Sequence, residues 1–519
     1  MQFDCLISGG KIADGSGTTP PFAADIGIKD EKIAAIGTLN PAQAASLIDV
    51  RGQIVCPGFI DVHVHSEFAL LGGRDQLATL RQGVTTQLLA PDGFGWAPLS
   101  PARAREFWDY AHFAYGAVDL SLNWPTAESY LDLFKDRIPA NVYPQVPHCA
   151  VRLHAMGWEP RPATAAELQI MEEKTREWME AGAGALCLGL DYQPSANADL
   201  RELVALSKVA ASYGGIYAAH LRYQILGRRA AWEEIMEISQ RAEIPVHVSH
   251  ERVDDETGPL LEKAEREGID LTLESYLYAA GMTHVVMMLP MEFQTGSPQE
   301  VLERLENPRS REICLPHLRK NLGTCGNQIV GHTRSGRYIG MTLKEAAATA
   351  GKSWEEFAYD LVLEEEGVEA FIFPWQTPTA ENEAALRRTA PHPRVMIASD
   401  GVYNVQHPHP RGSGCFAQVL ERYVRELKLL SLQQAIYKMS AFPAQRFGLR
   451  DRGRIATGLA ADLVVFDPDT VAARSTFAEP IRSAAGVDGV MVNGQWVIRK
   501  GEPTGALPGK VLRHSSARL

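Results

Sequence analysis

The sequence has little that is typical of a membrane, secreted or nucleic-acid-binding protein. No apolar run approaches the roughly 20 residues that span a bilayer, and the first residues do not resemble a secretory signal, so we expect neither a membrane partner nor export. The seven cysteines are scattered and form no CxxC pair, which argues against a disulfide framework and favours a reducing, cytoplasmic location. A net charge of −12 without basic runs argues against a nucleic-acid partner.

The length and composition indicate a large globular protein. The chain has 519 residues, 45% of them hydrophobic and 22% charged. Because single cores rarely grow past about 250–300 residues, we expect two domains or one large barrel with additions.

Both ends of the chain have the pattern of short β-strands. The strand-like segments are 6–12, 25–39, 461–467 and 489–499. Asn493-Gly494 predicts a two-residue hairpin turn in the last of them. We therefore predict one small β-domain that both termini build together from residues 1–57 and 450–519.

The middle of the chain alternates between short apolar runs and segments of helical periodicity. The runs are 60–65, 86–91, 145–152, 184–190, 215–221, 245–252, 270–278 and 394–401, and helices such as 164–181 and 199–213 are expected between them. Eight strands with intervening helices predict a (β/α)8 TIM barrel, an α/β fold, over residues 58–449. The long gap before the eighth run predicts an inserted lid or subdomain around 282–338.

Histidines and one aspartate stand where barrel strands are expected to end. His63 and His65 share one face of the first run. His220, His250 and Asp400 end the fifth, sixth and eighth runs. Each residue alone has a structural interpretation, as a buried histidine or a capping aspartate. Together they favour a metal site, because carboxyl ends of barrel strands converge and these donors suit Zn²⁺.

Asp92 ends the second run in a Pro-Asp-Gly sequence, and two interpretations of it stay open. Aspartate before glycine is common in turns. The same position would also let it act as a metal ligand from the second strand.

An ordered set of motifs resembles the amidohydrolase superfamily and, more narrowly, the N-acyl-D-amino-acid deacylases (D-aminoacylases). The motifs include PGFIDVHVHSE, GVTTQLLAPDGFGWAP, GGIYAAHLR, VHVSHERV, SDGVYNVQHPHPR and DRGRIATGLAADLVVFDP, and they extend along nearly the whole chain. The resemblance implies a metal-bearing barrel with a β-sandwich, the ligands His63, His65, His220 and His250, and Asp400 as the catalytic carboxylate.

The sequence departs from this family at residue 92, where D-aminoacylases typically have a cysteine ligand. Asp92 can replace it as a harder oxygen donor. The fourth run contains no lysine, so the carboxylated lysine of many other amidohydrolases has no counterpart there. We hypothesise that Asp92, His220 and His250 hold the principal metal and that His63, His65 and Asp400 form a neighbouring site.

The activity that the resemblance implies is metal-dependent hydrolysis of N-acyl-D-amino acids, with one or two Zn²⁺ ions and Asp400 as general base and acid. Candidate residues for binding this small-molecule substrate are Arg252, Tyr192, Tyr278 and His148. A structural interpretation has comparable weight for Arg252 and His148, and core packing is favoured for a single tyrosine. His407 and His409 are expected to fix the loop after Asp400. Phe94, Trp96 and the segment 285–290 hint at an apolar pocket.

Two alternatives remain. One is a different amidohydrolase reaction, such as opening of a cyclic amide in the manner of dihydroorotases and hydantoinases, or hydrolysis of another N-acyl or peptide bond. The other is a barrel that has lost its chemistry, against which the four histidines and Asp400 argue.

Overall fold

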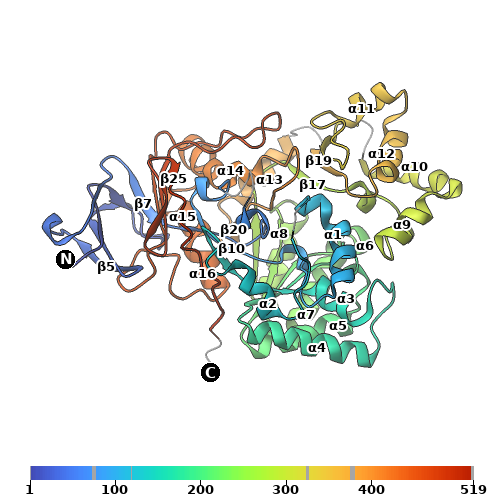
Figure 1. Ribbon diagram of the computed structural model, residues 1–519, viewed down its shortest axis with the longest axis horizontal. Helices are drawn as coiled ribbons and strands as arrows, with labels where there is room; N and C mark the ends of the chain where they lie inside the picture. The colour runs from blue at the N-terminus through green and yellow to red at the C-terminus, as the bar shows by residue number, and fades with distance from the viewer. Residues whose placement is uncertain (1, 73–76, 118–119, 323–325, 375–379, 516–519) are drawn as a thin grey trace.

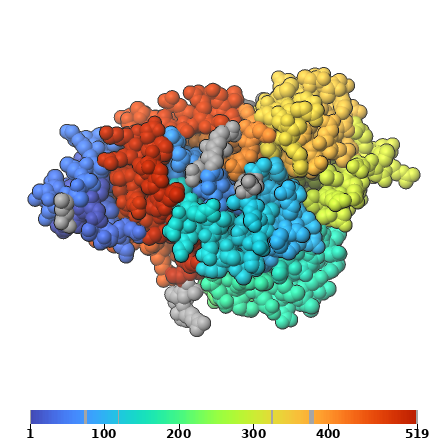
Figure 2. Space-filling view, in the orientation of Figure 1, coloured from blue at the N-terminus to red at the C-terminus, as the bar shows by residue number. Residues whose placement is uncertain are grey.

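The structure is a computed structural model that describes residues 2–72, 77–117, 120–322, 326–374 and 380–515. It has a β-rich end built from both termini, a central barrel, and an inserted unit at the opposite end (Figure 1). The space-filling view shows the same order, with the N- and C-terminal segments gathered at one end and residues of the insert at the other (Figure 2). No helix among the described residues is long and apolar enough to cross a membrane.

The barrel strands pair in parallel. The strands are β8 (Phe59–Asp61), β9 (Val64–His65), β10 (Val84–Leu88), β11 (Asn141–Tyr143), β12 (Val146–Pro147), β13 (Ala185–Gly189), β14 (Ile216–His220), β15 (Val246–Val248), β16 (Leu271–Ser275), β20 (Val395–Ile397) and β21 (Gly401–Val402). Their orders are β11-β10-β8, β12-β13-β14-β15-β16-β20 and β21-β9. The pairing of β21 with β9 joins the first and last strands of the barrel. The barrel has eight strands when β8 and β9, β11 and β12, and β20 and β21 are each counted as one interrupted strand.

Helices surround these strands. They are α1 (Pro101–Tyr115), α2 (Ala127–Leu131), α3 (His148–Met156), α4 (Ala165–Glu180), α5 (Leu200–Ser212), α6 (Tyr223–Leu226), α7 (Arg228–Ala242), α8 (Thr257–Arg266), α13 (Ala380–Thr389), α14 (Arg411–Gln418), α15 (Leu432–Met439) and α16 (Ala441–Arg446). Thr164 and Asp199 cap α4 and α5 with their side chains, which explains why both helices begin where the sequence predicts.

The β-rich end contains two packed sheets. One has the order β5-β4-β1-β6, and the other has the order β25-β24-β23-β22-β7-β2-β3. The second sheet pairs β7 (Ile54–Pro57) with β22 (Leu463–Phe466), so strands from the two ends of the chain are neighbours. A buried cluster that includes Ile26, Val55 and Val465 lies between the sheets. The fold is therefore a barrel with a small β-sandwich from both termini, as predicted.

The remaining strands of the sandwich are β1 (Cys5–Ser8), β2 (Lys11–Ile12), β3 (Phe22–Ala23), β4 (Asp25–Lys29), β5 (Lys32–Gly37), β6 (Leu47–Asp49), β23 (Val487–Val492), β24 (Gln495–Arg499) and β25 (Glu502–Pro503). Asn493 and Gly494 both have positive φ between β23 and β24, as the expected hairpin turn requires.

The insert lies between β16 and β20. It contains an antiparallel sheet of β17 (Ala280–Thr283), β19 (Ala370–Pro374) and β18 (Ile329–His332), together with α9 (Pro298–Leu305), α10 (Pro308–Leu322), α11 (Leu343–Ala350) and α12 (Trp354–Glu364). It has its own buried cluster, which includes Val285, Leu318 and Phe357. These elements extend past residue 338, and the predicted domain boundaries stay a prediction.

Four strand predictions differ from the structure, among them the eighth run, where residues 398–400 separate β20 from β21. The third run, 145–152, is not a continuous strand, because β12 ends at Pro147 and α3 begins at His148. All eight residues of that run are buried, so periodicity could not separate strand from helix. The sixth strand ends at Val248, before His250 and Arg252. The first barrel strand is interrupted at Val62 and His63, which separate β8 from β9.

Candidate metal centre

His63 and His65 direct their Nε2 atoms toward the same carboxylate. His63 Nε2 lies 3.7 Å from Asp400 Oδ1, and His65 Nε2 lies 3.6 Å from the same oxygen. On the far side of each ring, His63 Nδ1 lies 3.0 Å from Glu274 Oε1 and His65 Nδ1 lies 3.3 Å from the Tyr115 hydroxyl. These outer partners orient both rings so that Nε2 faces the centre.

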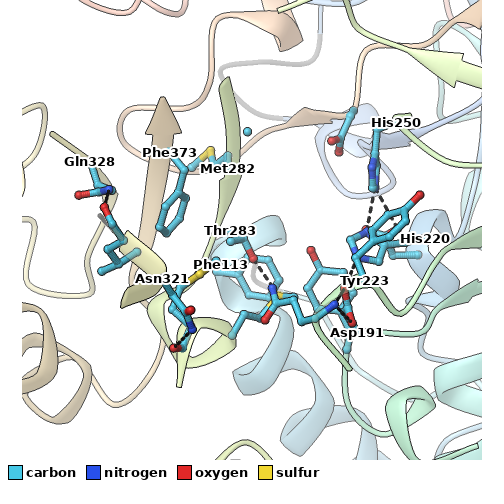
Figure 3. Close-up of a pocket in the computed structure, with 18 of the residues that line it drawn as sticks. Phe113, Asp191, His220, Tyr223, His250, Met282, Thr283, Asn321, Gln328 and Phe373 are labelled. Carbon is cyan, nitrogen blue, oxygen red and sulfur yellow. Dashed lines mark hydrogen bonds and ion pairs between the residues drawn. The ribbon is translucent and has the colours of Figure 1, made fainter. Parts of the chain in front are cut away.

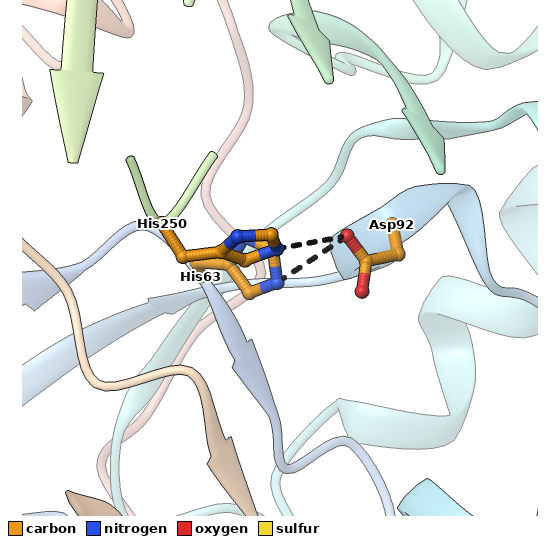
Figure 4. Close-up of side chains that lie close together, drawn as sticks. All are labelled: His63, Asp92 and His250. Carbon is orange, nitrogen blue, oxygen red and sulfur yellow. Dashed lines mark ion pairs between the residues drawn. The ribbon is translucent and has the colours of Figure 1, made fainter. Parts of the chain in front are cut away.

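Asp92 lies close to His63, His65 and His250. Its Oδ1 is 3.6 Å from His63 Nε2 and 3.8 Å from His250 Nε2. Figure 4 shows both rings facing this carboxylate. Its Oδ2 is 3.7 Å from His65 Nε2. The structure thus brings Asp92 to the histidines, although its Pro-Asp-Gly setting is also a tight turn.

The backbone is left-handed at three of these residues. Asp92, His250 and Asp400 have φ of 54°, 38° and 48°. Non-glycine residues rarely adopt this conformation, and such residues cluster at functional sites. Gly93 continues the turn with φ of 70°, and a Cβ there would lie 2.5 Å from the carbonyl oxygen of Cys187. Only glycine lets the Asp92 turn approach β13 this closely.

The donor atoms fit a divalent metal. His63 Nε2 and Asp92 Oδ1 are buried without a hydrogen-bond partner, and 3.6 Å is too long for a hydrogen bond between them. Two ligands about 2.1 Å from one tetrahedral zinc would be about 3.4 Å apart. In the described part of the chain, two groups bring three donor atoms each within 4.8 Å of one another: His63, Asp92 and His250, and His63, His65 and Asp400.

His220 adjoins the group of Asp92 and His250, and its predicted role as a ligand stays a prediction. Its Nδ1 lies 3.0 Å from His250 Nε2, and its Nε2 lies 3.1 Å from Asp191 Oδ2. His63, not His220, is therefore the residue grouped with Asp92 and His250. His63, His65 and Asp400 also have donor atoms close together, and whether they hold a second ion stays a prediction. His63 belongs to both groups and links them.

The charges of this cluster depend on one another. Burial raises the pKa of the Asp92 carboxyl, but the imidazoles of His63, His250 and His220 outweigh burial and hold this pKa well below its usual value. Burial lowers the pKa of His63, but Asp92 and Glu274 raise it well above its usual value. The site is thus built to hold ionised carboxylates against positive charge.

Asp400 has a cationic partner outside the cluster. Arg411 Nη1 lies 2.8 Å from Asp400 Oδ2, while Oδ1 faces His63 and His65. Burial raises the pKa of Asp400, but the Arg411 guanidinium and His65 lower it well below its usual value. Asp400 is therefore an ionised carboxylate that can accept a proton.

Sequence reasoning missed four residues that orient the site: Glu274, Asp191, Arg411 and Tyr115. Glu274 contacts His63 and His247 through its side chain and accepts a hydrogen bond from the backbone of His250. Glu274 lies on β16, and Asp191 directly follows the fourth run; the acidic residues at strand ends were a signal for both. Nothing in the sequence pattern indicated Tyr115, which lies on α1.

A cavity of about 920 Å³ opens over these residues and reaches the insert. Figure 3 shows His220, His250 and Tyr223 at one end of it, and Met282 and Phe373 at the other. Of the predicted substrate-binding residues, Tyr192 and Arg252 line the cavity, and the Tyr192 ring lies 5.1 Å from that of His220. Arg252 reaches the cavity from the loop after β15, which ends at Val248.

Tyr278 and His148 are not among the described residues that line the cavity. Tyr278 lies beside the ring of His409, which is fully buried. His148 is fully buried at the start of α3, where its Nδ1 lies 2.7 Å from Ser195 Oγ and its Nε2 lies 3.0 Å from Glu202 Oε1. Its contacts are those of a structural histidine. Phe94 and Trp96 also belong to the core.

The loop after Asp400 is held by two histidines. His409 Nδ1 accepts a hydrogen bond from the backbone N–H of Arg411 at 3.0 Å. His407 Nε2 lies 2.8 Å from the carbonyl oxygen of Phe477. Neither belongs to the two groups of candidate ligands among the described residues.

Two relatives that match over nearly their full length are named as deacylases. A D-aminoacylase of Alcaligenes xylosoxydans xylosoxydans is 34% identical over 100% of this chain and 99% of its own length. An N-acyl-D-glutamate deacylase of the same organism is 33% identical over 99% of this chain and 98% of its own length.

A solved structure extends the likeness to three dimensions. The N-acyl-D-glutamate deacylase of Bordetella bronchiseptica, solved with zinc and a phosphonate inhibitor that mimics the tetrahedral reaction intermediate, is 32% identical. The match has a TM-score of 0.82 and covers 99% of this chain and 100% of that one. The family model described as "Amidohydrolase family" matches residues 46–306 and 358–498, and the chain belongs to this family.

Proposed function

We propose that the protein is a zinc-dependent deacylase that hydrolyses the amide bond of N-acyl-D-amino acids. The observation that supports this most is the pair of overlapping ligand groups that share His63, because members of both line one large cavity and one of them is the ionised Asp400. The full-length likeness to deacylases of D-amino-acid substrates supports the same activity.

The residues that would hold the ions are His63, Asp92 and His250 in one group, and His63, His65 and Asp400 in the other, with His220 adjoining through His250. A divalent cation bound there supplies a Lewis acid for the amide carbonyl and lowers the pKa of water.

Asp400 is proposed to move the protons of the reaction. Its Oδ1 faces the centre, so it can take a proton from the attacking water. It can then return the proton to the departing amine, which must be protonated to leave. Arg411 keeps the carboxylate ionised before the reaction and fixes its orientation through Oδ2.

Arg252 is proposed to bind the substrate carboxylate. It lines the cavity two residues after His250, one of the candidate ligands. A guanidinium offers a planar fork that matches both oxygens of a carboxylate. Tyr192 also lines the cavity and is proposed to contact the substrate close to His220.

The insert supplies an apolar wall, to which we assign the apolar group of the substrate. Met282, Met287, Met288, Leu289 and Phe373 line this end of the cavity. Methionine side chains adapt to apolar groups of different shape. We therefore expect apolar N-acyl-D-amino acids to be preferred over acidic ones.

A chiral substrate panel tests the proposed function. We expect the zinc-loaded enzyme to release amino acid from N-acetyl-D-methionine and N-acetyl-D-leucine at a kcat/KM at least about tenfold above that for the L-enantiomers and for N-acetyl-D-glutamate; one apolar group of this size is worth about 1–3 kcal/mol in a pocket. Faster opening of dihydroorotate or a hydantoin than of any N-acyl amino acid would replace the proposal by the cyclic-amide alternative.

We further infer a reducing, cytoplasmic location. The six cysteines that the structure describes are all buried free thiols. Fractionation of the source cells, with the protein followed by antibody, tests this inference; recovery outside the cytoplasm would overturn it.

A further inference from the structure

A second concave surface lies at the end of the barrel opposite the metal centre. It encloses about 720 Å³ and is lined by Gly184, Ile216, Pro245 and Asp270, which lie at the starts of β13 to β16. The candidate ligands and Glu274 lie at or beyond the other ends of barrel strands. We call this surface the basal pocket.

Four arginines and one aspartate supply the charged side chains of the basal pocket: Arg446, Arg450, Arg452, Arg454 and Asp270. This balance is unusual in a protein whose net charge is −12. The Arg452 guanidinium already forms ion pairs with Asp451 and Asp462. Arg450 and Arg454 are exposed and form no ion pair with any residue that the structure describes.

Arg446 ends α16 and reaches the wall of the basal pocket with a side chain that is only 7% exposed. Its Nη1 lies 2.7 Å from Asp270 Oδ1, but the Asp270 side chain is 67% exposed. The buried Nε of Arg446 has no hydrogen-bond partner. Arg446 Nη2 also donates to the carbonyl oxygens of Val246 and Asp270, so this guanidinium is fixed in the wall and supplies positive charge there.

The last described residues form another part of the wall. Ser515 and His514 line the pocket. A Cβ on Gly448 would lie 2.7 Å from the His514 ring, so this segment packs on the turn between Arg446 and Arg450. Figure 1 shows the C-terminal segment running beside α16.

We propose that the basal pocket binds a small polyvalent oxyanion, a phosphate ion or the phosphoryl group of a metabolite, through Arg450 and Arg454, with the fixed positive charge of Arg446 in the wall beside them. Arginine forks match the geometry of phosphate oxygens and form charge-assisted hydrogen bonds with them. A phosphate has enough oxygens to accept from both exposed guanidinium groups, and it carries more negative charge than a single carboxylate.

Calorimetric titration of the full-length, metal-loaded protein tests this site. The probes are inorganic phosphate, glycerol phosphate and acetate, each at the same ionic strength. We expect saturable binding of phosphate or glycerol phosphate, and the tighter of the two identifies the source of the anion. Acetate is expected to bind at least about tenfold more weakly.

The discriminating variant is Arg450→Ala with Arg454→Ala, which removes two exposed side chains and should leave folding intact. We expect it to weaken phosphate binding about tenfold or more. Arg176→Ala with Arg309→Ala, which removes the same charge at exposed positions elsewhere, should bind as the parent does.

Phosphate that binds at the metal centre would be retained in both variants, so the comparison isolates the basal pocket. Absence of binding in the parent protein, or equal affinity in the two double variants, would overturn the proposal. Neither result bears on the deacylase activity, which the substrate panel tests separately.

Discussion

A carboxylate stands at residue 92, where the D-aminoacylases that this chain resembles typically have a cysteine. Its two oxygens face His63 and His65 at 3.6 and 3.7 Å, so it can serve both ligand groups, which a single sulfur would do less readily. Oxygen is a harder donor than thiolate. We therefore expect the centre to bind its metal less tightly than a cysteine-containing site and to accept manganese or cobalt more easily.

Replacement of Asp400 by asparagine tests its role in proton transfer. The change keeps the size of the side chain but removes its basicity, so kcat should fall by about 10²- to 10⁴-fold while the circular dichroism spectrum stays unchanged. Asp255→Asn, at a side chain that is 87% exposed, is the matched control and should be fully active. Near-parental turnover by Asp400→Asn would remove this residue from the proposed role.

Replacement of Arg252 by alanine tests carboxylate recognition. We expect KM for an N-acyl-D-amino acid to rise by about tenfold or more, because a charge-assisted hydrogen bond is lost. The corresponding N-acyl amino acid amide has no carboxylate, and its KM should be unaffected. Arg229→Ala, at a side chain that is 81% exposed, is the control. Equal effects on both substrates would assign Arg252 a structural role instead.

Single residues were predictable from sequence only where their position along a strand gave a signal. His63, His65, His250 and Asp400 could be placed near one another because strand ends converge in a barrel. The sequence could not predict which of these residues contact one another. Their contacts depend on the left-handed backbone at His250 and on Asp191, whose carboxylate lies against the His220 ring.

At the level of elements, the eight barrel strands could be predicted because apolar runs alternate with amphipathic helices. The residues at which these strands begin and end could not be predicted. The run 145–152 is buried throughout, so β12 and α3 differ in backbone but not in apolar character. The insert was visible only as a long gap, since its helices have ordinary amphipathic patterns and its three strands are short.

The insert contains a buried carboxyl that makes stability depend on pH. Burial raises the pKa of Glu369, directly before β19, to about 8. An unfolded glutamate has a pKa of about 4.3, so the unfolded chain loses this proton first as pH rises. The contribution of Glu369 to stability therefore falls between these two values, by at most about 1.4 kcal/mol per pH unit.

Glu369→Gln should remove this pH dependence. We expect the variant to gain stability over the parent as the pH rises from 5.5 to 8, measured as the free energy of unfolding in urea. Glu303→Gln on the exposed face of α9 is the control. A constant difference between variant and parent at both pH values would contradict the raised pKa.

At the level of the whole molecule, the candidate metal centre and its cavity lie at the carboxyl ends of the barrel strands, between the barrel and the insert. The termini pair through β7 and β22 at the other end of the molecule (Figure 1). The alternating strand patterns at both ends of the sequence made this sandwich predictable. The cavity was not predictable, because it arises where the insert covers the barrel.

Metal binding should stabilise the whole protein, because the ligand groups exist only in the folded chain. Removal of metal with a chelator is expected to lower Tm by several degrees, and added zinc should restore it. The variant His407→Ala, outside both ligand groups, should respond like the parent. A chelator that leaves the parent's Tm unchanged would mean that no metal is bound in the folded state.

The most direct test of the account is the divalent metal content per chain, measured by elemental analysis of the purified parent protein, of His63→Ala and of His407→Ala. His63 belongs to both ligand groups, so we expect one or two ions in the parent and in His407→Ala but less than half of that content in His63→Ala. A parent without divalent metal, or a His63→Ala variant with the parent's metal content, would contradict the account.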